Sequence, residues 1–117
     1  MKKPGALRRE SPNDTSRFLC VGPFTLDLYT RHVSSNETQL LLPPCAFDYL
    51  ATLVRNSPHP VSYQGLVLES QGYHLGKLEA QDLARSRIYL LRKVIEPDSQ
   101  TPQYILAVAG YGYRLAL

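Results

Sequence analysis

Short apolar runs alternate with turn residues between Phe18 and Leu42. Runs of this length are typical of β-strands, and Gly22-Pro23 separates the first two at a turn. The polar segment Ser34–Glu37 has the composition of a hairpin loop. The pattern therefore predicts a small antiparallel sheet of four strands: Phe18–Val21, Phe24–Leu28, Arg31–Val33 and Thr38–Leu42.

A helical period replaces this alternation from Pro43-Pro44 onwards, where a proline in the first turn of a helix loses no hydrogen bond. Apolar side chains then recur at i, i+3, i+4 and i+7, which predicts an amphipathic helix that ends at residues 56–60. Ser62 is a suitable N-cap for a second, shorter helix, and residues 71–78 are expected to form a loop. The apolar positions of the first helix are Phe47, Leu50, Ala51 and Val54.

A third helix is predicted from about Glu79 to Ile95, because its apolar residues are spaced by four, three and four. Acidic residues near its start and basic residues near its end match the helix dipole. After it, 103–108 and 113–117 are predicted as two strands joined by a tight turn over 109–112. The expected fold is α+β: a four-stranded antiparallel sheet, three helices and a C-terminal β-hairpin.

Charge is unevenly distributed along the chain. Of 13 basic and 10 acidic residues in 117, five basic and two acidic ones fall in residues 1–17. That segment also holds Pro4, Gly5 and Pro12 and has almost nothing to bury, so we expect a flexible tail or linker remnant. Residues 18–117 are expected to form one domain of balanced charge, in which only a local basic cluster would indicate a nucleic-acid partner.

Several function classes find no support in the sequence. Cys20 and Cys45 are expected to be buried free thiols, which indicates a reducing cytoplasm. No apolar run reaches the length of a membrane span, and no secretory signal is present. The three histidines, His32, His59 and His74, lack metal-ligand spacing and are expected at the surface. No catalytic motif appears, so we expect neither an enzyme nor a cofactor or small-molecule substrate.

The side of the third helix opposite its apolar stripe carries a local basic cluster. Four positive charges and no negative one lie between Arg85 and Lys93, although Asp82 precedes them on the same side. Arg85 or Ser86 would read base edges, while other residues would bind phosphates. This second set comprises Arg87, Tyr89, Arg92 and Lys93. A solvated helix face without a ligand is the alternative interpretation of the same pattern.

Several motifs occur in the same order and at the same spacing as in the OmpR/PhoB-type winged-helix domain, which the chain therefore resembles. This domain is the DNA-binding output module of bacterial two-component response regulators. Residues 88–93, Ile-Tyr-Leu-Leu-Arg-Lys, resemble the family's I-x-x-L-R-K. Residues 102–105 and 110–114 resemble its p-x-y-I and G-x-G-Y-R, and residues 42–50 resemble the entry to its first helix. The resemblance covers Phe18 to Leu117.

The resemblance implies that the third helix enters the major groove of double-stranded DNA and that the C-terminal hairpin, the wing, reaches the minor groove. It adds Tyr111, Tyr113 and Arg114 of the wing to the DNA contacts, and it matches Arg92 and Tyr113 to phosphate-contacting positions. It also implies a dimer on repeated half-sites and a contact of the 71–78 loop with RNA polymerase.

The chain departs from the family at positions that bear on DNA binding. The wing arginine is Ala109 here, and the two middle arginines of I-R-R-L-R are Tyr89 and Leu90. An alternative function is therefore a winged helix that mainly binds protein, with Tyr89, Leu90 and Tyr111 as an adhesive face. Tyr104, Tyr111 and Tyr113 would also suit stacking on single-stranded nucleic acid, although core and turn positions in the wing explain them more simply.

Overall fold

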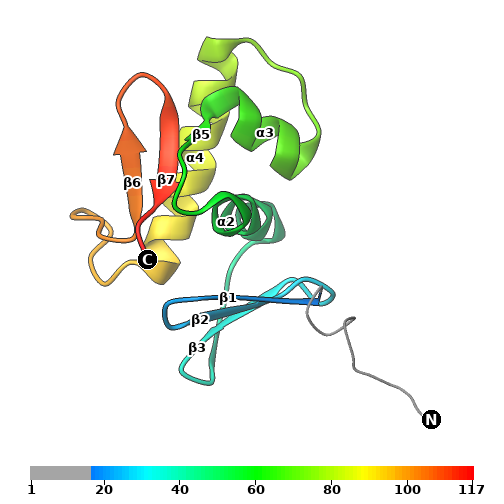
Figure 1. Ribbon diagram of the computed structural model, residues 1–117, viewed down its shortest axis with the longest axis vertical. Helices are drawn as coiled ribbons and strands as arrows, with labels where there is room; N and C mark the ends of the chain where they lie inside the picture. Colours follow the sequence, from blue (N-terminus) through cyan, green and yellow to red (C-terminus); the bar gives the residue numbers. More distant parts are fainter. Residues whose placement is uncertain (1–16) are drawn as a thin grey trace.

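The computed structural model describes residues 17–117, which form a four-stranded sheet, three helices and a three-stranded sheet. Figure 1 shows the four-stranded sheet on one side of α2 and the wing beside α4. This arrangement confirms the predicted winged-helix architecture. The expected flexible tail falls on residues 1–16, outside the described part, but Arg17 is described and its guanidinium pairs with Asp27 at 2.9 Å.

The N-terminal sheet is an antiparallel meander in the order β1-β2-β3-β4. Along β1 and β2 the more buried positions alternate with the less buried ones, so that one face packs on the core and the other meets solvent. The loop between β3 and β4 is shorter than predicted, because Asn36 and Glu37 adopt positive φ angles of 51° and 69° and close a two-residue turn. The strands are β1 (Phe18–Val21), β2 (Phe24–Asp27), β3 (His32–Ser35) and β4 (Thr38–Leu40).

Helix α2 (Pro44–Asn56) lies at the centre of the molecule and packs on both neighbouring helices and on the N-terminal sheet. Three residues of its predicted stripe, Phe47, Leu50 and Ala51, are buried, whereas Val54 is half-buried. Leu53, which lies outside the predicted stripe, is also buried. Pro44 occupies the first turn, as predicted. The helix therefore fixes the position of the other two helices relative to the sheet.

Helix α3 (Tyr63–Gln71) is capped by the Ser62 hydroxyl, which accepts a hydrogen bond from the Gly65 amide at 3.0 Å. It ends at Gly72, which adopts a left-handed conformation. Helix α4 (Lys77–Ile95) begins two residues earlier than predicted. The connecting loop thus comprises residues 72–76, shorter than the expected 71–78.

The wing consists of β6 (Ile105–Val108) and β7 (Gly112–Leu115), joined by a turn in which Gly110 has a φ of 72°. A short strand that the sequence did not predict, β5 (Val61–Ser62), pairs with β7. This pairing needs glycine at 112, because a Cβ there would overlap the Val61 carbonyl oxygen. Strand β5 thereby ties the start of α3 to the wing.

The predicted burial of the cysteines is wrong. Both thiols are free, but Cys20 is exposed and Cys45 is half-buried. Cys20 pairs with Thr25 across the sheet, on the side of the pleat that faces solvent, so its apolar sequence neighbours did not indicate its own exposure. The three histidines are exposed, as predicted. None of the helices in residues 17–117 is long and apolar enough to span a bilayer.

Candidate nucleic-acid interface

Helix α4 exposes the face that the sequence analysis singled out. Arg85, Ser86, Tyr89 and Lys93 are all exposed, whereas Ala84, Ile88, Leu91 and Ile95 on the opposite side are buried in the core. The division follows from 3.6 residues per turn: each set repeats every three or four residues and keeps to one side. The core thus anchors one side of α4 and leaves the other free to contact a partner.

Two contacts along this face hold its charged side chains in place without burying them. Arg85 Nη1 lies 3.9 Å from Asp82 Oδ1, and the two side chains remain 63% and 81% exposed. Lys93 Nζ donates to the Tyr89 hydroxyl at 3.4 Å and lies 5.1 Å from the centre of its ring. Pairs this exposed contribute less than about 1 kcal/mol, so these side chains are available to another partner.

Arg87 differs from its neighbours because its side chain is half-buried. Its Nη1 donates weakly to the Ser86 hydroxyl at 3.4 Å, and its buried Nε has no hydrogen-bond partner among residues 17–117. Burial raises the pKa of Tyr49 to about 12, although the positive charge of Arg87 acts to lower it. The Tyr49 hydroxyl donates to Gln71 at 2.8 Å, which links α2 to the end of α3.

Arg92 turns towards the wing and away from the exposed face of α4. Its Nη2 donates to the Ile105 carbonyl at 2.8 Å, and its guanidinium lies 5.4 Å from the centre of the Tyr113 ring. One donor of the side chain is thus committed to the backbone of β6. Arg92 joins the last turn of α4 to both strands of the wing.

The three wing residues singled out from the sequence occupy different environments. Tyr111 lies on the turn and is 47% exposed, Arg114 is half-buried, and Tyr113 is buried. The Tyr113 ring packs edge-on against Tyr63 at 5.9 Å, and burial raises its pKa despite the nearby charges of Arg92 and Arg85. Tyr113 therefore contributes to the packing between the wing and α3.

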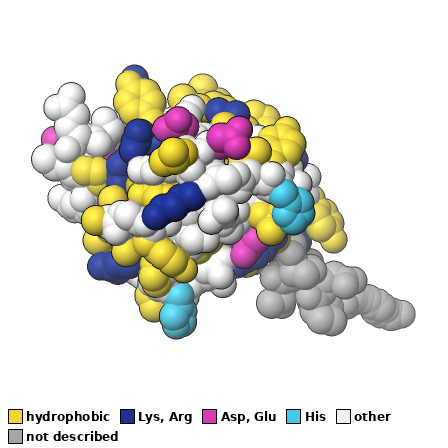
Figure 2. Space-filling model, turned by 90° about the horizontal axis from the view of Figure 1, so that it is seen from above, with side chains coloured by type: hydrophobic (Ala, Val, Ile, Leu, Met, Phe, Trp, Pro, Cys, Tyr) yellow, Lys and Arg dark blue, Asp and Glu magenta, His cyan; other side chains and the backbone are white. Residues whose placement is uncertain are grey.

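Viewed from the end of the molecule at the top of Figure 1, basic, acidic and hydrophobic side chains alternate over the surface (Figure 2). They do not form one continuous basic area on this face. The local charge pattern along α4 is therefore more informative than the net charge of +3.

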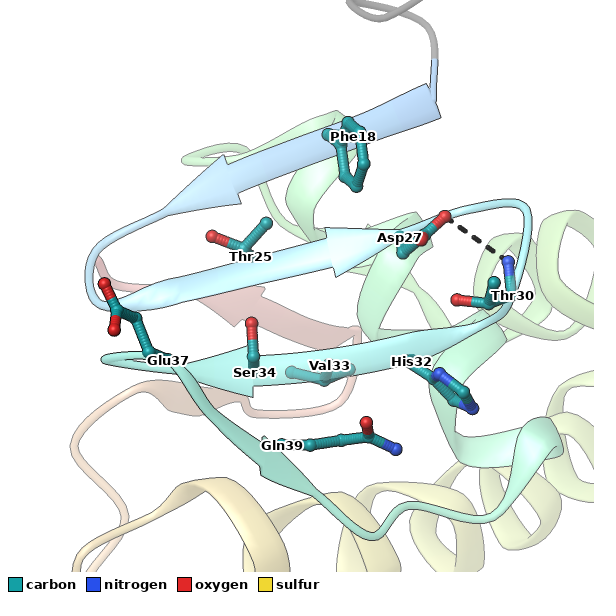
Figure 3. A pocket seen from close by; sticks show the side chains of 9 residues that line it. All are labelled: Phe18, Thr25, Asp27, Thr30, His32, Val33, Ser34, Glu37 and Gln39. Carbon is teal, nitrogen blue, oxygen red and sulfur yellow. Dashed lines mark hydrogen bonds between the residues drawn. The ribbon is translucent and has the colours of Figure 1, made fainter.

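A separate hollow lies on the outer face of the N-terminal sheet (Figure 3). It has a volume of about 340 Å³ and is lined mostly by short polar side chains, among them Thr25, Asp27 and Ser34. Asp27 accepts a hydrogen bond from the Thr30 amide at 3.3 Å at one end of it. No group of three or more potential metal ligands occurs within residues 17–117.

Comparison with known families decides the classification. The family model described as "Transcriptional regulatory protein, C terminal" matches residues 36–115, which is more than half of the chain. The chain belongs to this family. It is an OmpR/PhoB-type winged-helix domain, as the motifs predicted, and the family agrees with the predicted role as a DNA-binding output domain of a transcription regulator.

Two relatives from Mycolicibacterium smegmatis illustrate the similarity. The domain is 28% identical over 109 residues to the DNA-binding response regulator MtrA, covering 93% of this chain and 47% of the relative. It is 32% identical over 114 residues to the sensory transduction protein RegX3, covering 93% and 49%. The chain thus spans about half the length of the curated relatives it matches.

Solved structures share the winged-helix fold. The DNA-binding domain of RstA from Klebsiella pneumoniae, solved in complex with the RstA box, has a TM-score of 0.70 at 24% identity and covers 86% of this chain and 97% of its own. The DNA-binding domain of CpxR from E. coli has a TM-score of 0.69 at 23% identity, covering 84% and 94%.

Sequence reasoning missed a second residue, besides Arg92, that joins α4 to the wing. The predicted third helix ends at Ile95, and the next residue, Glu96, has a buried carboxylate that accepts hydrogen bonds from the amides of Gln103, Tyr104 and Ile105. The one signal in the sequence was the position of this acidic residue at the C-terminal end of the helix, where its negative charge opposes the helix dipole. Such a residue needs compensating donors, and the start of β6 supplies them.

Proposed function

We propose that this domain binds double-stranded DNA sequence-specifically to regulate transcription, as the output domain of a two-component response regulator. The observation that carries the proposal is the exposed face of α4, where Arg85, Tyr89 and Lys93 project from a helix anchored on its other side. A helix presented in this way fits the major groove. The related domain of RstA was solved with its DNA box, which supports the same mode here.

Within this mode each exposed residue has a distinct task. Arg85 and Ser86 read base edges from the first half of α4. Lys93, Tyr89 and the outer part of Arg87 bind backbone phosphates. Tyr111 and Arg114 bring the wing towards the neighbouring groove. Arg92 and Tyr113, which the resemblance matched to phosphate contacts, act mainly by holding the wing against α4, since their polar groups face the protein.

The remaining parts of the function concern partners beyond the domain. Because the chain spans about half of its relatives, a receiver domain would carry the phosphorylation that controls it. The domain would bind repeated half-sites as a dimer in the bacterial cytoplasm. The loop at 72–76, with the exposed Tyr73 and the adjoining Leu78, would face RNA polymerase.

The alternative of a protein-binding winged helix rests on an apolar face formed by Tyr89, Leu90 and Tyr111. Leu90 packs partly against the core, so of these three residues Tyr89 and Tyr111, 59% and 47% exposed, are the ones available on this face. Both tyrosines are also suited to contact DNA. The structure thus offers this alternative little apolar area.

The test is selection of binding sites from a random pool of double-stranded DNA at two salt concentrations. We expect an enriched repeated motif whose affinity falls steeply with salt. Arg85→Ala removes the base contact and lowers affinity for that motif about 10- to 100-fold. Arg55→Ala is the matched control, because Arg55 is an exposed arginine at the end of α2 whose loss changes the net charge equally. Weak, sequence-independent binding that Arg85→Ala leaves unchanged would refute the proposal.

A further inference from the structure

Asp82 is the acidic residue on the proposed DNA-binding face of α4, and it contributes little to folding. Asp82 is the more exposed member of its pair with Arg85, with 81% of its side chain accessible. The N-cap of the helix is Gly76 and the acidic residue of the first turn is Glu79, so Asp82 lies beyond the positions where a carboxylate stabilises the helix start. Its contact with Arg85 at 3.9 Å is long and solvated, and it adds little to folding.

A carboxylate in this position opposes binding to a polyanion. Positive side chains bind DNA phosphates irrespective of sequence. A fixed negative charge on the same face therefore reduces the affinity for DNA of any sequence. Asp82 would therefore lower non-specific affinity unless it met a donor on the DNA. Its chemistry restricts that donor, since an ionised carboxylate only accepts hydrogen bonds.

The base edges of the major groove offer few such donors. Cytosine presents the N4 amino group, whereas adenine places an acceptor, N7, beside its N6 amino group. Guanine and thymine present acceptors, which a carboxylate repels. Asp82 is thus complementary to cytosine, and Arg85, with its fork of donors, is complementary to O6 and N7 of guanine.

The spacing of the two side chains places these contacts on neighbouring base pairs. Three residues of helix advance about 4.5 Å along its axis, which is close to the step of about 3.4 Å between base pairs. Resting on the proposed DNA-binding function, we propose that Asp82 and Arg85 act as a paired base-reading element that selects cytosine and guanine at adjacent positions of the operator half-site.

Asp82 and Arg85 already neutralise each other's charge before the domain binds DNA. In the free protein Asp82 lies beside Arg85 on the exposed face of α4, and on the correct bases each side chain exchanges its solvated partner for a base edge. On other sequences the carboxylate stays unpaired near phosphates. The pair therefore adds discrimination and little net affinity.

The experiment is site selection from the random DNA pool with the 117-residue chain and three variants: Asp82→Asn, Arg85→Ala and Glu37→Gln. For the unchanged chain we expect adjacent cytosine and guanine in the enriched motif. Asp82→Asn should lose about tenfold preference for cytosine and shift towards adenine, because an amide pairs with N6 and N7. It should also bind non-specific DNA more tightly. Arg85→Ala should lose only the guanine.

Glu37→Gln is the control for net charge, since Glu37 lies on the β3–β4 turn and is exposed. It should leave the motif unchanged. If Asp82→Asn binds all sequences more tightly with an unaltered motif, Asp82 only repels phosphates and the inference is wrong. If the unchanged chain enriches no motif, the proposed function itself fails. Circular dichroism would verify that each variant is folded.

Discussion

The carboxylate of Glu96 accepts a hydrogen bond from the backbone N–H of Ile105 at 2.8 Å. One helical turn earlier, Arg92 donates to the carbonyl of the same residue at 2.8 Å. Both backbone polar groups of Ile105 are thus held by side chains at the end of α4. Because Ile105 is the first residue of β6, this arrangement sets the position of the wing relative to the helix proposed to enter the major groove.

Replacement of Glu96 by glutamine should destabilise the domain by about 2–3 kcal/mol, because buried amides would lose a charged acceptor and meet an amide NH₂ group. Urea denaturation followed by circular dichroism measures this loss. Asp98→Asn is the matched control, since Asp98 is exposed and its side chain accepts a hydrogen bond from the Gln100 amide. Equal, small effects of the two substitutions would show that the carboxylate of Glu96 does not hold β6.

Replacement of Arg92 by methionine should weaken DNA binding without altering its salt dependence. The substitution keeps the aliphatic stem but frees the Ile105 carbonyl, at a cost of about 1 kcal/mol in the free energy of unfolding. Lys93→Met, in contrast, should lower the slope of log affinity against log salt by about one, because it removes a phosphate contact. A slope reduced as much by Arg92→Met would assign Arg92 to phosphate, as the resemblance implies.

Alanine at Gly112 should cost about 3 kcal/mol or more, since its Cβ would overlap the backbone of β5 and neither strand can move away from the core. At Gly110 the Cβ of alanine would meet open space, so the substitution should lower the free energy of unfolding only by the cost of a positive φ, about 1 kcal/mol. Thermal unfolding of both variants distinguishes them. Similar melting temperatures would mean that β5 separates from β7 at little cost.

The stability of the domain should decrease at acid pH through Asp27. The Arg17 guanidinium beside it, and the amides of Thr30 and Tyr29, hold the pKa of Asp27 well below its usual range. A carboxyl whose pKa is lowered in the folded state stabilises that state above its unfolded pKa of about 3.9. This contribution is lost as the pH falls through the folded pKa. Urea midpoints of Asp27→Asn should therefore depend less on pH below about 4 than those of the unchanged chain, whereas Glu37→Gln should behave like the unchanged chain.

Two of the eight tyrosines should resist ionisation at alkaline pH. Burial raises the pKa of Tyr49 to about 12 and raises that of Tyr113 above its usual value. A raised pKa favours the folded state below the unfolded value of about 10, and the advantage is lost as the pH rises through the folded pKa. Near-ultraviolet titration should show a late phenolate step that Tyr49→Phe diminishes. The same step in Tyr49→Phe and the unchanged chain would contradict this assignment.

Sequence periodicity was sufficient to predict an element wherever the local preferences of its residues and their burial in the fold agree. The strands of the N-terminal sheet, the Ser62 cap and the buried stripe of α4 follow from spacing and residue type alone. The exposed residues Arg85, Tyr89 and Lys93 follow from the same stripe, because the side opposite a buried face must meet solvent. The part of the candidate interface that lies on α4 was therefore predictable from the sequence.

Contacts between distant segments were decided only by the tertiary structure. Strand β5 has two residues, too few to show a period, and it exists because β7 offers it a hydrogen-bonding edge. The direction of Arg92 depends on where β6 lies, thirteen residues further on, and the exposure of Cys20 depends on its partner Thr25. The sequence by itself determined the helices, the strands other than β5, and the exposed face of α4. How the wing is fastened to that helix arises from hydrogen bonds across the fold, which no local pattern encodes.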